Sequence, residues 1–551
     1  MRTWSPTAET GRRARTTPPE VVDVAIVGCG LGGLATGAIL TRAGLRVACF
    51  DAHYVAGGCA TMFARKSVHG HFHFDVGLHY IGDCGPQGTI PRVLRAAGVE
   101  PDLVPLDADG FDIFSFPDME FRAPVGHDAF EARLLDAFPA ERRGIQKYMG
   151  VVRQLDWFLG RLDAHDGRTT PVTLLQAPFR APGLLRWGRA PVSALLDACT
   201  RDPRLRAVLL GPHGDYGLPP SRVAALLHVG LQNHYLRGAF YPRGGGQAFA
   251  DALAAQIEAG GGTVHLRLPI EQILVEDGRA VGVRTEARHG LVHTTRAAAV
   301  VANADLRETV TRLVDPAHWP AGFVRRVEGF TWPAGIFMTC LGVEGPIPGL
   351  GNANHWLFDH YDTERMYREA SPQKPVGAYI TSATGKDPES PHHAPEGCST
   401  VEIMTLVPGD PRVWGVEPDA IHGWKYRKTS AYADLKAATE ANLIERFKAR
   451  FPEAGPIVYQ ESASPVTHSR FTRATLGTSY GIAASPDQFM QHRPGPRSPL
   501  PGLYLCGAST RSGHGIAGAL ASGAVAAAVV KKDQAATGSP GRARAGAARR
   551  G

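Results

Sequence analysis

The sequence predicts an α/β protein in which a Rossmann-type dinucleotide-binding domain is assembled from non-contiguous parts of the chain. Three observations indicate this fold: a strand that enters a glycine fingerprint near the start, a strand, glycine turn and helix near the end, and short alternating strands and helices between them. A strand followed by a glycine turn and a helix is the nucleotide-binding unit of such folds. We therefore expect both ends of the chain to contribute to one domain.

The first glycine turn follows an apolar run and has the spacing G-x-G-x-x-G. Gly28 permits the tight turn out of the strand, Gly30 lets the backbone approach a pyrophosphate, and Gly33 lets the following helix pack on the sheet. Leu31 and Gly32 begin that helix, whose free N–H groups attract phosphate. This stretch is therefore predicted to bind a dinucleotide.

A second strand is predicted over residues 46–50 and ends at Asp51. This acid lies about 20 residues past the glycines, where a carboxylate binds the ribose hydroxyls of a dinucleotide. The alternative is a strand that happens to end in an exposed aspartate. Gly57 and Gly58 then offer a second close backbone approach, expected beside the ribose and the pyrophosphate.

The net charge of +7 lies entirely in the two ends of the chain. Residues 1–20 and 531–551 are rich in Arg, while the charges of the residues between them sum to zero. Both ends have few large apolar side chains, so we expect disordered tails over 1–20 and 533–551. The body shows no basic face or nucleic-acid motif, so no nucleic-acid partner is expected.

Eight cysteines are scattered singly, with no C-x-x-C pair. This pattern argues against a disulfide framework and a structural zinc site, and it fits a reducing cytoplasm. No metal is expected, since H-E-x-x-H spacing is also missing. Residues 24–41 and 515–530 are uncharged, but the first stretch carries the fingerprint and the second is short and alanine-rich. We therefore expect no transmembrane helix and a cytoplasmic protein.

The middle of the chain begins with a helical region. Residues 130–162 place apolar side chains at three- and four-residue intervals, the period of a helix packed on a core. Helices broken by prolines follow over 171–239, and within them residues 179–189 mix large apolar side chains with three arginines. This composition is typical of an interfacial membrane-binding segment and equally of a surface helix, so peripheral membrane contact stays open.

The last ordered block repeats the opening element. A strand around Tyr504 enters a turn at Gly507, and an alanine-rich helix follows Gly515. The N-terminus of this helix carries a partial positive charge, which would face a cofactor ring that gains negative charge on reduction. Because two nucleotide-facing turns imply one large cofactor, and only one complete fingerprint is present, FAD fits better than a nicotinamide.

The chain is expected to leave this domain and return to it twice. After a turn at 241–247, a helix and short strands continue to residue 305, and residues 331–460 are long enough for a second domain. We expect the FAD-binding parts at 21–110, 240–330 and 461–532. An α+β substrate domain, partly helical and in that part a candidate membrane-facing surface, is expected at 111–239 and 331–460.

Four blocks of sequence resemble the flavin amine-oxidase-like enzymes, and within them the phytoene desaturase, carotenoid isomerase and retinol saturase branch. In chain order they are residues 28–33 with Asp51, 57–58 with 74–82, 234–245 and 504–518. Family members more often have Glu where Asp51 stands. In the last block Arg511, Ser512 and His514 replace residues of a His-Pro-Gly-Gly-Gly motif, and Ala517 replaces a proline. These departures lie where the flavin ring and the substrate are expected to meet, so they bear on the identity of the substrate more than on that of the cofactor.

The resemblance implies hydride transfer between the flavin N5 and a carbon of a long apolar polyene or isoprenoid. Alignment supplies most of the catalytic effect, and an acid or base handles the accompanying proton. The acid–base candidates are His79, Tyr80, Arg243, Arg511 and His514. For His79 and Tyr80 the alternative is a hydrogen-bonded loop pair, and for His514 a surface cap. The expected cofactor-binding residues are Gly28, Gly30, Leu31, Gly32, Gly33, Asp51, Gly57, Gly58, Arg243, Gly507, Ala508, Gly515 and Ile516.

The expected function is an FAD-dependent oxidoreductase that desaturates or saturates carbon–carbon bonds of a lipophilic polyene, with an unidentified electron donor or acceptor. One alternative is a redox-neutral cis–trans isomerase of polyenes that uses reduced flavin. Another, from a different class, is a non-catalytic lipid-escort protein on the same fold. The glycines at both ends of the chain count against the escort protein, because an escort protein has no need of a pyrophosphate site.

Overall fold

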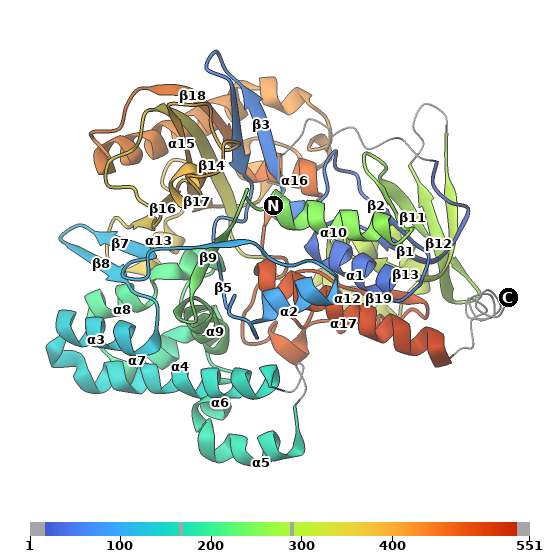
Figure 1. The fold of residues 1–551 in the computed structure, drawn as a ribbon, viewed down its shortest axis with the longest axis horizontal. Helices are drawn as coiled ribbons and strands as arrows, with labels where there is room; N and C mark the ends of the chain where they lie inside the picture. Colours follow the sequence, from blue (N-terminus) through green and yellow to red (C-terminus); the bar gives the residue numbers. More distant parts are fainter. Residues whose placement is uncertain (1–16, 165–168, 287–290, 537–551) are drawn as a thin grey trace.

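The computed structural model describes residues 17–164, 169–286 and 291–536, so most of both expected tails lies outside the described residues. Figure 1 shows two β-sheet regions, with a group of helices below the second one. Residues far apart in the sequence meet in each region. The cofactor site is positioned by the first sheet, and the substrate site by the second sheet and the helices.

The first sheet has seven strands, most of them parallel. Its order is β10 (Thr263–His265), β2 (Val47–Phe50), β1 (Val21–Val27), β13 (Thr294–Ala302), β12 (Arg279–Thr285) and β11 (Ile270–Glu276), and β19 (Leu503–Leu505) also pairs with β13. Ala25 is opposite both Ala48 and Val300, so β1 is central. Strands covered on both faces are expected to be almost wholly apolar, and β2 is buried along its whole length.

Helices from both ends of the chain pack side by side on this sheet. They are α1 (Leu31–Arg42), α10 (Gln247–Ala259), α2 (Thr89–Ala96) and α17 (Gly515–Ala536). The hydroxyl of Thr36 donates a 3.0 Å hydrogen bond to the Gly523 carbonyl, and a Cβ on Gly523 would lie 2.2 Å from the Gly32 carbonyl oxygen. Small residues thus allow α1 and α17 to touch, which joins the two predicted glycine turns in one domain.

Helix α17 is the single helix of the described part that is long and apolar enough to cross a membrane by length and composition. The sequence analysis predicts no transmembrane helix in this region. In the structure, this helix packs against α1 and α2, and Leu520, Ala526 and Val530 are fully buried. Buried core helices share this composition, so the helix is weak evidence for a membrane span.

The second sheet also has seven strands and is mainly antiparallel. Its order is β18 (Ile457–Ala463), β14 (Gly335–Glu344), β17 (Cys398–Val407), β16 (Val376–Thr381), β15 (Asn354–Leu357), β7 (Asp112–Phe116) and β8 (Met119–Ala123). The long helix α15 (Ser430–Arg450) packs on it. Strands β7 and β8 come from the first excursion of the chain and the others from the second, so both excursions share one sheet.

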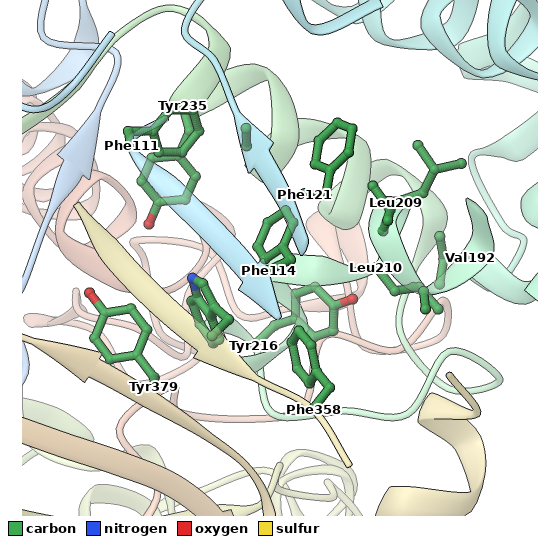
Figure 2. Close-up of a cluster of buried hydrophobic side chains, with 14 of the residues drawn as sticks. Phe111, Phe114, Phe121, Val192, Leu209, Leu210, Tyr216, Tyr235, Phe358 and Tyr379 are labelled. Carbon is green, nitrogen blue, oxygen red and sulfur yellow. The ribbon is translucent and has the colours of Figure 1, made fainter. Parts of the chain in front are cut away.

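A group of helices adjoins the β7–β8 edge. Its members are α3 (His127–Ala137), α4 (Arg142–Asp163), α5 (Pro171–Arg180), α6 (Pro182–Trp187), α7 (Val192–Cys199), α8 (Pro203–Leu209) and α9 (Ala225–Leu236). The helical period predicted over 130–162 is thus divided between α3 and α4. Figure 2 shows the packing, in which Phe114 and Phe121 of the sheet meet Leu209 and Val192 of the helices.

Short elements connect the two regions. They are the hairpin β3 (Met62–Lys66) and β4 (His71–Asp75), the sheet β5 (Ile81–Gly82), β9 (Ala239–Pro242) and β6 (Leu103–Pro105), and the helices α11 (Leu306–Glu308), α12 (Ala321–Glu328), α13 (Thr363–Arg368), α14 (Ala383–Lys386) and α16 (Pro465–Thr472). Three expected boundaries fall inside elements, and the first of them, between residues 239 and 240, lies within β9. Residue 461 lies within β18, and residue 533 lies within α17, where Asp533 pairs with Arg497 at 2.6 Å. Residues 17–20 are attached to the sheet, because Thr295 donates to the Pro19 carbonyl at 2.8 Å.

Candidate functional site

The first glycine turn lies between β1 and α1. Gly28 has a φ of +100°, which a residue with a Cβ rarely adopts. A Cβ on Gly32 would lie 2.6 Å from Asn303 Oδ1, and one on Gly33 would lie 2.1 Å from the Gly28 carbonyl oxygen. Gly30 precedes α1 and offers no side-chain cap. The first N–H groups of α1 are therefore available to an anion.

Asp51 follows β2 on the other side of this turn. Its Oδ2 accepts a 2.6 Å hydrogen bond from the Cys29 N–H, and its Oδ1 accepts one of 2.7 Å from the His53 N–H. A carboxylate can accept about four hydrogen bonds, so acceptor positions remain for ligand hydroxyls. Asp51 also lines the cavity described below. Its position therefore suits the ribose contact expected from the sequence.

The second glycine pair crosses the first turn at contact distance. Gly57 forms an isolated bridge with Gly30, and the φ angles of Gly57 and Gly58 are +132° and +61°. A Cβ on Gly58 would lie 3.1 Å from Gly30 Cα. Side chains at these positions would separate the two segments, so the glycines keep the backbone open to a ligand between them.

The terminal turn lies beside the first glycine turn and lines the same cavity. Gly507 has a φ of +96°, and its N–H donates a 2.7 Å hydrogen bond to Ser522 Oγ. Ala508, Gly515 and Ile516 line the same cavity as the first turn. The structure therefore brings together the glycine motifs that the sequence analysis identified at opposite ends of the chain.

Arg511 and His514 also line this cavity. Arg511 Nε donates a 3.2 Å hydrogen bond to the Arg493 carbonyl. The His514 ring lies edge-on to Tyr480, with ring centroids 5.4 Å apart. Burial lowers the pKa of His514 to about 3, and the nearby Arg493 cation acts in the same direction. His514 is therefore neutral at physiological pH and holds no imidazolium proton to donate.

The cavity has a volume of about 1370 Å³ and connects the glycine turns with the helices. Its far end is lined by apolar side chains of α4, α5, α6 and α9, namely Leu155, Phe158, Leu159, Leu162, Leu174, Ala177, Leu184, Leu185, Leu226, Leu227 and Leu231. One end is therefore built from backbone amides and the other from aliphatic side chains. Such a site suits a polar cofactor followed by a lipophilic molecule.

Between these ends, His79 and Tyr80 lie beside Asp215, which the sequence analysis did not select. The Tyr80 hydroxyl donates to Asp215 Oδ2 at 2.8 Å and the Tyr235 hydroxyl donates to the same oxygen at 3.0 Å. The two tyrosine rings stack with centroids 4.2 Å apart. Burial, together with the cation of Lys386, lowers the pKa of His79 to about 3. His79 is therefore neutral as well.

No motif in the sequence marks Asp215. It ends the short turn Gly211–Asp215, far along the chain from every glycine motif, and its only local cue is a carboxylate within the mostly apolar stretch 207–218. Asn303 was missed for the same reason. Its amide donates to the Gly28 carbonyl at 3.2 Å, and its Oδ1 accepts from Cys506 Sγ at 3.4 Å. Both residues acquire their roles only through tertiary contacts.

The family of the chain follows from a comparison of its sequence. Residues 31–410 and 429–531 match the family described as flavin containing amine oxidoreductase. The chain belongs to this family. As a flavin containing amine oxidoreductase family member it is an oxidoreductase, and its cofactor is FAD.

Two curated relatives and one solved structure illustrate the likeness. The chain is 29% identical over 523 residues to All-trans-retinol 13,14-reductase of Macaca fascicularis, covering 89% of this chain and 82% of the relative. It is 26% identical to Phytoene desaturase (neurosporene-forming) of Cereibacter sphaeroides, covering 91% and 93%. An oxidoreductase from Methanosarcina mazei has a TM-score of 0.59 at 18% identity, covering 93% of this chain and 100% of that chain, and this match concerns the fold alone.

The residues at the glycine turns fit FAD. The uncapped start of α1 suits a pyrophosphate, and Asp51 suits a ribose. Gly30, Gly58 and Gly507 leave room where a Cβ would meet Asn303 or neighbouring backbone within about 3 Å. Leu31, Gly32, Ala508, Gly515 and Ile516 line the same space.

Two expected cofactor residues lie elsewhere. Arg243 does not line the cavity; its Nη1 lies 3.1 Å from Asp387 Oδ1 and 3.3 Å from Glu389 Oε2, and its Nε lies 3.4 Å from Asp102. In the structure, Arg243 therefore has an ion-pairing position outside the cavity lining. Gly33 also lies outside the cavity lining and serves the helix packing that its glycine role predicted.

Metal ligands and thiols could also support chemistry at such a cavity. Within residues 17–164, 169–286 and 291–536, no group of three or more His, Cys, Asp or Glu side chains is arranged to hold a metal ion. Cys59 lines the cavity, and its Sγ lies 3.8 Å from His468 Nε2. Burial raises the pKa of the Cys59 thiol to about 11. This thiol is therefore protonated, which makes it a poor nucleophile.

Proposed function

We propose that this protein is an FAD-dependent oxidoreductase that transfers hydride between the flavin and a carbon–carbon double bond of a lipophilic polyene or isoprenoid. The observation that carries the proposal is the continuous cavity, which begins at the two glycine turns and ends among aliphatic side chains of α4, α5, α6 and α9. A long apolar molecule that enters between these helices would reach the flavin end with one carbon–carbon bond.

The lining of the cavity favours a hydrocarbon over a polar amine. An amine substrate needs a polar or aromatic enclosure along its length, whereas the side chains that α4, α5, α6 and α9 contribute to this arm are mainly leucines. The relatives named All-trans-retinol 13,14-reductase and Phytoene desaturase support the same substrate class. The former relative has the higher identity, so we propose saturation of a double bond as the direction.

When bound, FAD supplies a two-electron hydride donor or acceptor. The residues of this chain bind and orient the reactants. The turns at Gly28 and Gly507 fix the cofactor, and the aliphatic arm aligns the polyene and excludes water, which is the main requirement for such a transfer. His79 and His514 are neutral and unpaired at Nε2 and Nδ1 among the described residues. They can orient a polar end of the substrate by hydrogen bonding.

We also propose that the cavity opens toward a membrane surface at α5 and α6. The α5–α6 surface comprises Val172, Leu174, Leu175, Phe179 and Leu185, and their exposed fractions range from 54% to 84%. Leu174 and Leu185 also line the cavity. Arg180, Arg186 and Arg189 lie in the same segment, as in interfacial segments that bind anionic lipids. In Figure 1, α5 is the outermost helix of the molecule on this side.

The test combines flavin spectroscopy with lipid analysis of the purified holoprotein. We expect a flavin spectrum, a co-purified apolar polyene in the mass spectrum of the extract, and reoxidation of the anaerobically reduced flavin by that polyene. Reduction of the oxidised flavin by the polyene would reverse the proposed direction. Formation of cis–trans isomers without net flavin redox change would indicate an isomerase. Turnover of amines with no effect of polyenes would refute the proposed substrate class.

A further inference from the structure

Four carboxyl groups and one lysine are clustered beside the middle of the cavity. Asp75, Asp112, Glu402 and Lys386 are each only 1% exposed. Asp215 is the member that reaches the cavity. The groups come from β4, β7, β17, α14 and the turn before Tyr216, so no local motif predicts the cluster. The established family membership assigns no task to it.

The hydrogen bonds to Asp215, which lines the cavity, involve only one of its two oxygens. Both tyrosine hydroxyls, from Tyr80 and Tyr235, donate to Oδ2. Among the described residues, Oδ1 has no hydrogen-bond partner. The Tyr80 hydroxyl also lies 3.3 Å from Asp112 Oδ2. A hydroxyl has one hydrogen, so Tyr80 can donate to only one of the two carboxyls at a time.

The charges in this cluster favour retention of protons. Four buried carboxylates beside one ammonium would leave an excess of negative charge in a region of low dielectric, which is strongly unfavourable. Burial raises the pKa of Asp215 to about 6, against hydrogen bonds from Tyr80 and Tyr235. Burial, aided by the charge of Asp215, raises the pKa of Asp112 to about 7. The two carboxyls lie on either side of one hydroxyl, and this arrangement favours a state in which one of them keeps its proton.

We propose that Asp215 is the catalytic residue that transfers the proton in the double-bond reaction, and that Asp112 and Lys386 set its protonation state. This inference rests on the proposed function. In saturation, one carbon of the double bond accepts a hydride from the reduced flavin, and the other carbon takes the proton from Asp215 Oδ1. The double bond gains two electrons and the flavin loses them. Asp215 is left as a carboxylate and regains its proton from the Asp112 pair and solvent.

Other groups around Asp215 constrain its titration. The groups in electrostatic or hydrogen-bond contact with it are Tyr80, Tyr235, Asp112, Lys386, Tyr216, Tyr367, Tyr379, Tyr480 and His514. Burial raises the pKa of each of these tyrosines well above its usual value, and His514 is neutral. Near neutral pH, Asp112 and Lys386 can change charge beside Asp215, since burial raises the pKa of Asp112 and lowers that of Lys386 to about 7. Burial also raises the pKa of Asp75 and Glu402, the other carboxyls of the cluster, and both interact with Lys386.

The first experiment is an infrared pH titration of the resting flavin-loaded protein, which requires no substrate. We expect a carboxylic-acid carbonyl band that titrates near pH 6 to 7 in the wild type. It should be lost, or moved to lower pH, in Asp215→Asn, and retained in Asp128→Asn, which changes an exposed carboxylate on α3. Asn keeps the acceptor for both tyrosines, so Asp215→Asn should fold. A near-neutral band that persists unchanged in Asp215→Asn would overturn the proposal.

The second experiment follows reoxidation of the reduced flavin by a polyene. We expect Asp215→Asn to slow this step by about 10²- to 10⁴-fold while flavin binding is retained. Asp112→Asn removes a like charge and should move the alkaline limb of the pH–rate profile to lower pH. Lys386→Met removes a compensating cation and should move it to higher pH. Each shift is expected to be about one unit.

A merely structural role would not produce opposite shifts in the two variants. Unchanged profiles, or shifts of the same sign, would overturn the assignment of Asp215. If the wild type itself reacts with no polyene, the proposed function fails. The infrared titration would still show whether Asp215 titrates near neutral pH, independently of that function.

Discussion

The side-chain amide of Asn303 donates a 3.2 Å hydrogen bond to the backbone carbonyl of Gly28. Asn303 stands at the end of β13, between the first glycine turn and the terminal one. Its Oδ1 would lie 2.6 Å from a Cβ on Gly32 and 3.0 Å from a Cβ on Gly507. One asparagine thus holds both halves of the cofactor site in register, and the absence of side chains on these glycines permits it.

A methyl group at Gly32 is expected to disrupt this junction. In Gly32→Ala the new Cβ would meet Asn303 Oδ1 at 2.6 Å and the Ala519 carbonyl oxygen at 3.0 Å. We expect the flavin content per protein to fall more than about tenfold, which corresponds to about 1.4 kcal/mol of binding free energy. The matched control is Gly322→Ala in α12, where a Cβ meets nothing within 4 Å. Equal flavin content in both variants would contradict this account of the turn.

Arg243 provides a test of its ion-pairing position. Its partner Asp387 is fully buried, while Arg243 itself is 40% exposed. Removal of the cation in Arg243→Met is expected to lower the free energy of unfolding by about 1–3 kcal/mol, a value reduced for the solvent around the guanidinium. The affinity for FAD should not change. A variant with wild-type stability and weakened FAD binding would instead support the cofactor contact inferred from the sequence.

Buried histidines predict a loss of stability in acid. The His228 ring is fully buried and bonds to the hydroxyls of Tyr148 and Tyr216 at 3.0 and 3.1 Å. Burial lowers its pKa from 6.5 to about 4. Below pH 6.5 this histidine binds a proton in the unfolded chain, whereas in the folded protein it stays neutral down to about pH 4. The free energy of unfolding that depends on the neutral ring is therefore lost as the pH falls from 6.5 to 4.

The variant His228→Gln is expected to unfold more easily at pH 7, by about 1–3 kcal/mol, because its hydrogen bonds are impaired. Its unfolding free energy should nevertheless depend less on pH between 6 and 4.5, by up to about 1.4 kcal/mol per pH unit. Chemical denaturation across this range measures the slope. His69→Gln, in the exposed turn between β3 and β4, should keep the wild-type slope. An unchanged slope in His228→Gln would show that this histidine is already charged in the folded protein.

The α5–α6 surface predicts binding to anionic vesicles. Leu175 and Phe179 are 74% and 84% exposed and lie outside the cavity lining. In the double variant Leu175→Ser and Phe179→Ser, we expect vesicle binding to fall by about tenfold or more, since each side chain contributes about 1.5–3 kcal/mol when buried. Val68→Ser, 96% exposed in the turn between β3 and β4, is the control. Flotation with vesicles measures the binding of both variants. If the double variant binds vesicles as well as the Val68→Ser control does, this surface has no membrane role.

The sequence predicted the parts of the site that local patterns determine. A strand, a glycine turn and a helix are specified by neighbouring residues, and the turns at Gly28 and Gly507 were both found in one cavity. The helices of 171–239 were predicted for the same reason, and residues 179–189 were noted for their mixture of large apolar side chains and arginines. Asp51 was selected because its distance from the glycines is fixed by one helix and one strand, and it lines the same cavity as the glycine turns.

The rest depends on contacts between distant segments. Asp215 and Asp112 are 103 positions apart, and their shared hydroxyl comes from Tyr80 in a third segment. Arg243 lies in a family-like block, yet its acids come from residues 102, 387 and 389. No spacing rule relates such residues, because their distances are set by how two sheets and a group of helices pack.

The central claim is hydride transfer between the flavin and a carbon–carbon bond, and the most direct measurement is anaerobic stopped-flow spectroscopy of the reduced holoenzyme mixed with a panel of apolar polyenes. The account predicts that a polyene reoxidises the flavin in equimolar amount and gains two hydrogen atoms, one of them from solvent. If no polyene reoxidises the reduced flavin, none reduces the oxidised flavin, and a small amine reduces it instead, the claim is contradicted.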